Sequence, residues 1–159
     1  MLTIRKGIKT DLPFVLELIK ELADYENEVG EVSVTLKQLE DDGFCKNPSY
    51  QFLVAESNKK IIGMAFYFIR YSTWKGKMLF LEDFIVNKEY RRMGVGNKLF
   101  SEIIKIAQES NLNGMCWQVL DWNEVAINFY RKYNAGISGK WLNGKLTKTQ
   151  INTFNHLSI

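Results

Sequence analysis

The spacing of apolar residues changes from a period of two to a helical period within the first twenty positions. LTIRK (residues 2–6) alternates between apolar and polar residues and predicts a short strand. A helix is predicted next, because five apolar residues then recur at helical spacing: Leu12, Val15, Leu16, Ile19 and Leu22. We expect Thr10 to be the N-cap of this helix, whose first turn tolerates Pro13.

A second helix and a β-hairpin are predicted in the following segment. Thr35 and Gln38 have the spacing of a capping box, so a short helix should begin there and end near residues 42–43. Residues 50–56 and 61–71 are rich in aromatic and β-branched residues and flank a turn at Ser57-Asn58. This pattern predicts two antiparallel strands.

The remaining pattern alternates strands and helices. KMLFLEDFIV (77–86) predicts a strand, apolar spacing from Leu99 to Ala107 predicts a helix, and GMCWQVL (114–120) predicts another strand. Asn123 should cap a last helix over residues 124–133, and Asn134 follows it, where a left-handed residue is usual. We expect a β-rich tail after this helix.

The order of these elements determines the predicted fold class. A strand, a helix and a strand in succession predict a parallel crossover inside a mixed sheet, so the fold is α/β or α+β. A chain of 159 residues, 46% of them hydrophobic, is suited to one globular domain covering residues 1–159.

Composition narrows the possible functions. The net charge of +3 argues neither for nor against polyanion binding. Arg91 and Arg92 are only a local pair and no basic stripe continues from them, which argues against a nucleic-acid partner. No apolar run has the length of a membrane helix, so no membrane association is expected. Cys45 and Cys116 form no CxxC pattern and predict reduced thiols in the cytoplasm. With His156 as the only histidine, a zinc site or a histidine triad is not expected.

The segment RRMGVG (91–96) is the first candidate for a binding site. Its glycines follow the strand too late for a dinucleotide fingerprint, and no GK[ST] completes a P-loop. The N–H groups at a helix start lack intrahelical partners, and Gly94 and Gly96 would let an anion approach them. Two interpretations stay open at this point: a pyrophosphate-binding turn, or an ordinary start of a helix.

Two further features have both a functional and a structural interpretation. Glu82 and Asp83 are adjacent in an apolar strand, where alternation points one toward each face; they either serve a function or form a buried salt bridge. Tyr130 lies two turns into the last predicted helix, where its phenol could face a cleft. Taken alone, Tyr130 is better explained as a core tyrosine with a bonded hydroxyl.

Taken together, these segments resemble a known family. RRMGVG after the strand FLEDFIV (80–86), followed by NEVA (123–126) and Tyr130, resembles the acyl-CoA-binding core of the GNAT N-acetyltransferases. LIKELADYE (18–26), WKGK (74–77) and WNE (122–124) extend the similarity to the diamine (spermidine/spermine) and thialysine N-acetyltransferases. The resemblance implies a mostly antiparallel mixed sheet with a splayed central strand pair and flanking helices.

The resemblance also implies acetyl-CoA as co-substrate, without a metal. The backbone of one strand would pair with the pantetheine arm, the glycine turn would hold the pyrophosphate, and the start of the last helix would line the thiol end. The residues concerned are Phe84, Ile85 and Val86 for the strand, Arg91, Arg92, Met93, Gly94, Val95, Gly96 and Asn97 for the turn, and Asn123, Glu124, Val125 and Ala126 for the helix.

Catalytic roles follow from the same resemblance. Glu82 would accept the proton of the acceptor amine through an ordered water, and Tyr130 would protonate the departing thiolate. A backbone N–H of the splayed strand, that of Phe84, would stabilise the developing oxyanion.

The acceptor is expected to be a small amine held by acidic and aromatic side chains. The candidates are Tyr25, Glu26, Glu82, Asp83 and Trp141. Ser72 and Gly139 stand where similar polyamine acetylases have acids, which makes a small diamine or thialysine as good a candidate as spermidine. Relatives of this kind are usually homodimers. A protein lysine or N-terminal acetyltransferase and a non-catalytic acetyl-CoA sensor remain alternatives.

Overall fold

The computed structural model describes residues 1–154. The chain forms two compact units, Met1–Gln118 and Val119–Ile159, and the assignment of one domain to residues 1–159 stays a prediction. The strands are β1 (Leu2–Lys6), β2 (Gln51–Ser57), β3 (Lys60–Ser72), β4 (Gly76–Val86) and β5 (Met115–Trp117). The α-helices are α1 (Leu12–Tyr25), α2 (Leu36–Gly43), α3 (Val95–Glu109), α4 (Glu124–Arg131) and α5 (Lys148–Asn152). Short 3-10 turns occur at Lys9–Asp11, Val29–Glu31 and Lys88–Tyr90.

The first unit is built on a five-stranded sheet with strand order β1-β2-β3-β4-β5. The first four strands are antiparallel neighbours, whereas β5 pairs with β4 in parallel after the α3 crossover. The β2–β3 hairpin turns at Asn58 and Lys59, both with positive φ, as a two-residue hairpin turn requires. The predicted mixed, mostly antiparallel sheet is therefore confirmed.

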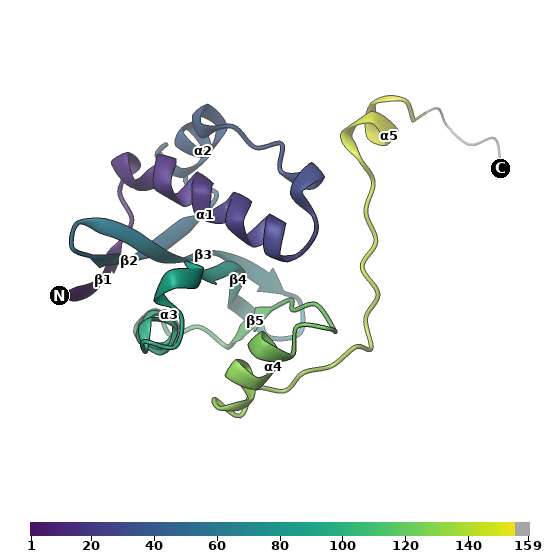
Figure 1. Ribbon diagram of the computed structural model, residues 1–159. Helices are drawn as coiled ribbons and strands as arrows, with labels where there is room; N and C mark the ends of the chain where they lie inside the picture. Colours follow the sequence, from purple (N-terminus) through teal and green to yellow (C-terminus); the bar gives the residue numbers. More distant parts are fainter. Residues whose placement is uncertain (155–159) are drawn as a thin grey trace. The chain divides into compact units, whose positions relative to one another are not determined.

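Helices cover both faces of this sheet (Figure 1). On one face, α1 and α2 contribute Leu12, Val15 and Leu39 to a core with Phe52 and Met64. On the other face, Val95 of α3 packs with Ala55 and Ile62. Each fully buried aliphatic side chain contributes about 1.5–3 kcal/mol relative to an exposed one, so both helices are held by their apolar faces.

The start of α1 differs from the sequence prediction. Asp11, not Thr10, precedes the helix, and a 3-10 turn occupies residues 9–11. The buried Asp11 carboxylate accepts two hydrogen bonds from Arg5, at 2.7 and 2.9 Å, and one from the N–H of Ile8 at 2.9 Å. Burial alone would raise the pKa of Asp11, but these bonds hold it below its ordinary value. Bonds from Arg5 and Ile8, six and three residues earlier in the chain, therefore hold Asp11 at the helix start.

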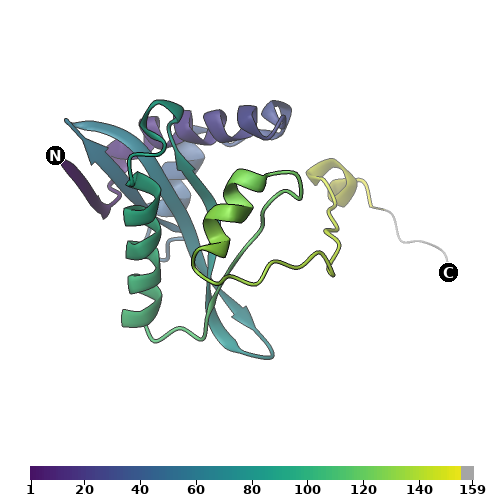
Figure 2. The ribbon, with the colours of Figure 1, turned by 60° about the horizontal axis from the view of Figure 1, so that its bottom comes forward.

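The β4–β5 pairing is short. β5 pairs with Leu79, Phe80 and Leu81 only, while β4 continues to Val86. At the other end, the β3–β4 hairpin extends past β2, whose pairing with β3 stops at Tyr67 (Figure 2). Because β5 pairs with only part of β4, the remainder of β4 has no strand neighbour on that side among the described residues. A splayed strand pair has this arrangement.

The second unit contains α4, α5 and extended segments. Asn123 caps α4 by accepting a hydrogen bond from the N–H of Ala126 at 3.1 Å, and Asn134 is left-handed with φ 56°, both as predicted. The predicted β-rich tail is wrong: residues 135–154 contain no strand, and α5 is their regular element. Strand β5 and helix α4 are also shorter than predicted. His156 lies outside the described residues.

Candidate active site

A β-bulge at Glu82 shapes the second half of β4. Leu81 pairs with Tyr67 and Asp83 pairs with Phe66, so Glu82 is an extra residue without a partner on β3. A bulge interrupts the alternation of faces and re-aims side chains, and bulges are frequent beside active sites. The simple alternation expected for Glu82 and Asp83 therefore does not apply at this point. Asp83 shares the α1-covered face with Phe66, because directly paired residues lie on one face of a sheet.

Three carboxylates gather where the end of α1 meets this bulge. Burial and then the negative charges of Glu82 and Glu26 raise the pKa of Asp83 to about 6, from an ordinary value of 3.8. Burial and the charge of Glu28 also raise the pKa of Glu26. Within residues 1–154, neither Glu82 nor Asp83 forms an ion pair with a lysine or arginine, so a buried salt bridge does not explain them. The site has an excess of negative charge that a cation would relieve.

The glycine turn lies between the 3-10 turn that follows β4 and the start of α3. Arg92 and Gly94 both have positive φ, 62° and 79°, and α3 begins at Val95. Across the described part of the chain, the N–H groups of Met93, Gly94, Val95 and Gly96 donate no hydrogen bond to protein acceptors. Successive N–H groups in a turn with left-handed residues form an anion-binding concavity, which the dipole of the helix strengthens. An added Cβ at Gly94 would meet nothing within 4 Å, so the space beside this turn is open.

Strand β4 and α1 position the other predicted residues of the first unit. Ile85 is buried in the core, and the ring of Phe84 packs edge-to-face on Phe100 with centroids 5.6 Å apart. Arg91 donates from Nε to the carbonyl oxygen of Val86 at 2.9 Å, and its guanidinium lies 5.1 Å from the centre of the Tyr25 ring. One region between the end of α1 and the end of β4 therefore contains the glycine turn together with Tyr25, Glu26, Glu82 and Asp83. Asn97 is exposed on the first turn of α3.

Sequence reasoning missed one residue of this region. Glu21 on α1 contacts the turn after β4 through both carboxylate oxygens. The only signal was its place within LIKELADYE, where spacing alone does not show that a glutamate reaches a loop 66 residues away.

The other predicted residues lie in the second unit. Asn123 and Tyr130 are buried, whereas Val125 is 75% exposed and Trp141 is 82% exposed. Glu124 forms an exposed ion pair with Arg131 at 3.9 Å, and Ala126 is half-buried. The proximity of these residues to β4 stays a prediction.

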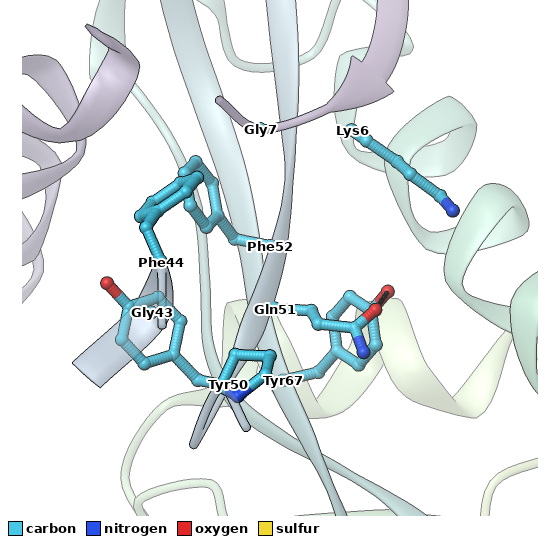
Figure 3. A pocket seen from close by; sticks show the side chains of 9 residues that line it. Lys6, Gly7, Gly43, Phe44, Tyr50, Gln51, Phe52 and Tyr67 are labelled. Carbon is cyan, nitrogen blue, oxygen red and sulfur yellow. Dashed lines mark hydrogen bonds between the residues drawn. The ribbon is translucent and has the colours of Figure 1, made fainter. Parts of the chain in front are cut away.

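A small, partly open pocket lies elsewhere in the first unit. It has a volume of about 180 Å³ and is lined by residues of β1, the end of α2, β2 and β3, among them Lys6, Phe44, Gln51 and Tyr67 (Figure 3). The phenol of Tyr67 donates to Gln51 across this pocket at 3.0 Å. No predicted site residue lines it, so this pocket carries no part of the predicted chemistry.

Two further properties of residues 1–154 concern metal binding and membrane spanning. In this range, no group of three or more His, Cys, Asp or Glu side chains is placed to hold a metal ion. Nor does this range contain a helix that is both long and apolar enough to cross a bilayer.

Known proteins are similar to this chain in sequence and in fold. Residues 15–135 match the acetyltransferase (GNAT) family. A thialysine N-epsilon-acetyltransferase from Bos taurus is 35% identical over 83% of this chain and 82% of that protein. A human spermidine/spermine N(1)-acetyltransferase-like protein 1 is 37% identical, over 83% of this chain but 20% of that longer protein. A possible acetyltransferase from Clostridium difficile 630 shares the fold, with a TM-score of 0.78, 24% identity and coverage of 92% and 98%.

These matches cover most of the chain. The chain therefore belongs to the acetyltransferase (GNAT) family, and it is an acyltransferase. The family resemblance drawn from the sequence is confirmed, as is the predicted fold class.

Proposed function

We propose that this enzyme transfers the acetyl group of acetyl-CoA to the primary amine of a small diamine, polyamine or aminoalkyl amino acid. One observation carries the proposal: uncompensated carboxylates at the β4 bulge lie close to a turn that presents open N–H donors. The first feature suits a cationic acceptor and the second an anionic cofactor.

The residues of the first unit fit the cofactor. The N–H groups from Met93 to Gly96 would hold the pyrophosphate, with Arg92 and Asn97 at the rim and Arg91 fixing the turn to β4. The backbone of Phe84, Ile85 and Val86 would pair with the pantetheine arm beyond the end of the β4–β5 ladder. Asn123, Glu124, Val125 and Ala126 at the start of α4 would line the thiol end. Acetyl-CoA supplies an acetyl group activated as a thioester.

The acceptor amine must lose a proton before it attacks, because its unperturbed pKa is about 10.4. We assign proton acceptance to Glu82 through an ordered water, and the binding of the ammonium form to Tyr25, Glu26, Asp83 and Trp141. As the C–N bond forms and the C–S bond breaks, Tyr130 would donate its phenolic proton to the sulfur, and the second proton lost by the nitrogen would restore the phenol. The N–H of Phe84 is assigned to the carbonyl oxygen, where negative charge develops.

The preferred acceptor is expected to be short. Relatives are named for thialysine and for spermidine or spermine, and Ser72 and Gly139 replace acids expected of polyamine acetylases. Ser72 accepts hydrogen bonds from the N–H groups of Trp74 and Lys75, at 3.3 and 3.2 Å, so its hydroxyl is engaged in the β3–β4 turn. Ser72 pairs with Gly76 of β4. Gly76 is six residues from Glu82 along this strand, which corresponds to a distance of about 20 Å.

We further propose a cytoplasmic homodimer. Cys45 and Cys116 are both free thiols, as expected in a reducing compartment. Exposed apolar residues in the tail, Trp141 and Leu142, are 82% and 94% exposed and would be covered by a second copy.

Thioester cleavage measured with a panel of amines tests the proposed activity. We expect turnover with thialysine and small diamines, and kcat/KM for these at least equal to that for spermine. Tyr130→Phe should lower kcat about ten- to a thousandfold while acetyl-CoA binding stays nearly intact. Turnover only with lysine or N-terminal peptides would instead favour a protein acetyltransferase. Acetyl-CoA binding without turnover of any amine would favour a sensor.

A further inference from the structure

We propose that Glu21 is a positioning residue that holds the pyrophosphate-binding turn in its binding conformation. This inference rests on the proposed role of the turn, and it adds a residue outside the turn on which cofactor affinity depends.

The two carboxylate oxygens of Glu21 accept hydrogen bonds from two consecutive residues at the junction between β4 and the turn. Oε2 accepts a hydrogen bond from the side-chain amide of Asn87 at 2.8 Å, and Oε1 accepts one from the backbone N–H of Lys88 at 2.9 Å. Asn87 is itself fixed on both sides: its N–H donates to the carbonyl oxygen of Ile62 at 2.9 Å, and its Oδ1 accepts from the N–H of Glu89 at 3.2 Å. Glu21 thereby fixes the first residues after the strand.

Arg91 extends this contact toward the glycines. Its guanidinium lies 3.8 Å from Oε1 of Glu21, packs over the ring of Tyr25 and donates to the carbonyl oxygen of Val86. The next residue, Arg92, already has the left-handed φ of 62° that begins the concavity. Glu21 therefore contacts Asn87, Lys88 and Arg91, which belong to the short stretch that connects β4 to the left-handed Arg92.

The two N–H donors that face the side chain of Glu21 require an acceptor at both of its terminal atoms. Both oxygens face donors, and a carboxylate can accept at both, whereas an amide would place its NH₂ against either Asn87 or Lys88. The side chain is 25% exposed, so these bonds are partly shielded from water. Losing a hydrogen bond to a charged group is expected to weaken the geometry it maintains by about tenfold in an equilibrium constant.

Because of where Glu21 binds, its loss should weaken the binding of ligands with a pyrophosphate and spare ligands without one. Within residues 1–154, the hydrogen bonds of Glu21 go to Asn87 and Lys88, which lie after the strand proposed for the pantetheine arm and before the pyrophosphate turn. A ligand without phosphates should be insensitive to Glu21. A general structural defect would affect both kinds of ligand.

The test compares acetyl-CoA with S-acetylpantetheine, which lacks the pyrophosphate and nucleotide, on the full-length protein. For Glu21→Gln we expect the acetyl-CoA Kd from calorimetry to rise about tenfold and kcat at saturation to change little. The KM for S-acetylpantetheine should stay within about twofold of wild type. Glu17→Gln is the matched control, because Glu17 on the same helix bonds Lys20 and is 70% exposed.

A swapped pair tests whether the contact itself matters. In Glu21→Gln/Asn87→Asp, the amide of Gln can donate to the new carboxylate while its oxygen still accepts from Lys88, so acetyl-CoA affinity should recover. Asn87→Asp alone, with two facing carboxylates, should be as weak as Glu21→Gln. If one single variant does not fold, the other single and the double variant carry the same comparison.

The outcomes separate this inference from the proposed function. Wild-type acetyl-CoA affinity in Glu21→Gln, or equal losses for acetyl-CoA and S-acetylpantetheine, would overturn the role of Glu21. If Gly94→Ala nevertheless loses acetyl-CoA affinity, the pyrophosphate turn itself stands. If Gly94→Ala also binds acetyl-CoA as wild type does, the assignment of the turn fails together with the inference drawn from it.

Discussion

At the scale of single residues, Asp83 shows how burial and neighbouring charge prepare a site for a cation. Its pKa of about 6 reflects the cost of keeping a carboxylate charged on a half-buried face beside Glu82 and Glu26. A bound ammonium group would offset that cost. The acceptor should therefore lower the pKa of Asp83 on binding, and protonation of Asp83 should oppose binding.

The raised pKa of Asp83 gives a signed prediction for stability. Because the folded-state pKa exceeds the ordinary value of 3.8, the folded protein binds this proton more tightly than the unfolded chain. The contribution of Asp83 to the free energy of unfolding should therefore fall as pH rises from about 4 to about 6. Denaturant titrations should show this slope in wild type, and Asp83→Asn should remove it and be the more stable protein at neutral pH.

Two measurements check the cause. Carbon NMR of the side-chain carboxyl should place the Asp83 midpoint near 6, and Glu82→Gln should lower it. An Asp83 midpoint near the ordinary 3.8 in wild type would contradict the account.

At the scale of elements, the junction of β4 with α3 combines two backbone devices. A bulge at Glu82 re-aims the acids, and left-handed residues before Val95 open the helix start. The residues proposed for the cofactor and for the acceptor thus lie on consecutive stretches of one chain segment, and α1 contacts that segment.

Substitutions at Gly94 should separate backbone strain from exclusion of the ligand. With φ 79° and open space for a Cβ, Gly94→Ala should destabilise the fold by about 1 kcal/mol through strain, and Gly94→Asn by less because Asn tolerates this conformation. Both should weaken acetyl-CoA binding by about tenfold or more, because both side chains enter the space beside the N–H groups. Thermal melts and calorimetry measure the two effects.

Gly30→Ala is the control for Gly94, since a Cβ there also meets nothing within 4 Å and its φ is not left-handed. It should leave acetyl-CoA affinity unchanged. Restored affinity in Gly94→Asn would show that strain alone, and not occupation of the site, caused the loss.

At the scale of the whole molecule, the tail carries several large apolar side chains with high exposed fractions. Trp141, Leu142 and Leu146 are 82%, 94% and 68% exposed within six residues. Isolated exposed apolar residues are ordinary, but a run of them marks an interaction surface. The missing β structure of the tail is consistent with a segment that would gain partners from a second copy.

We expect sedimentation equilibrium at micromolar concentration to give about twice the chain mass of 18.5 kDa. Trp141→Ser and Leu142→Ser should shift the protein toward the monomer, because each removes apolar area from the proposed interface. Val29→Ser is a matched control, since Val29 is 58% exposed in the first unit. A wild-type protein of monomer mass would contradict the homodimer.

The sequence by itself determined the elements whose signals are local. The capping box of Thr35 and Gln38, the Asn123 cap, the β2–β3 hairpin and the amphipathic α3 all depend on residues within a few positions of one another. Family resemblance added the candidate residues around Glu82, the glycine turn and Tyr130, because the order and spacing of motifs are properties of the sequence.

Only the tertiary structure decided the features that join distant segments. The bulge at Glu82 follows from register against β3. Nearer in sequence, Asp11 replaced Thr10 at the start of α1 because Arg5 and Ile8 bond its carboxylate, which depends on how the chain bends after β1. The predicted β-rich tail was wrong because apolar residues at strand-like spacing form strands only where a neighbouring strand is available. Glu21 became visible through contacts 66 and 67 residues away, which no local pattern can encode.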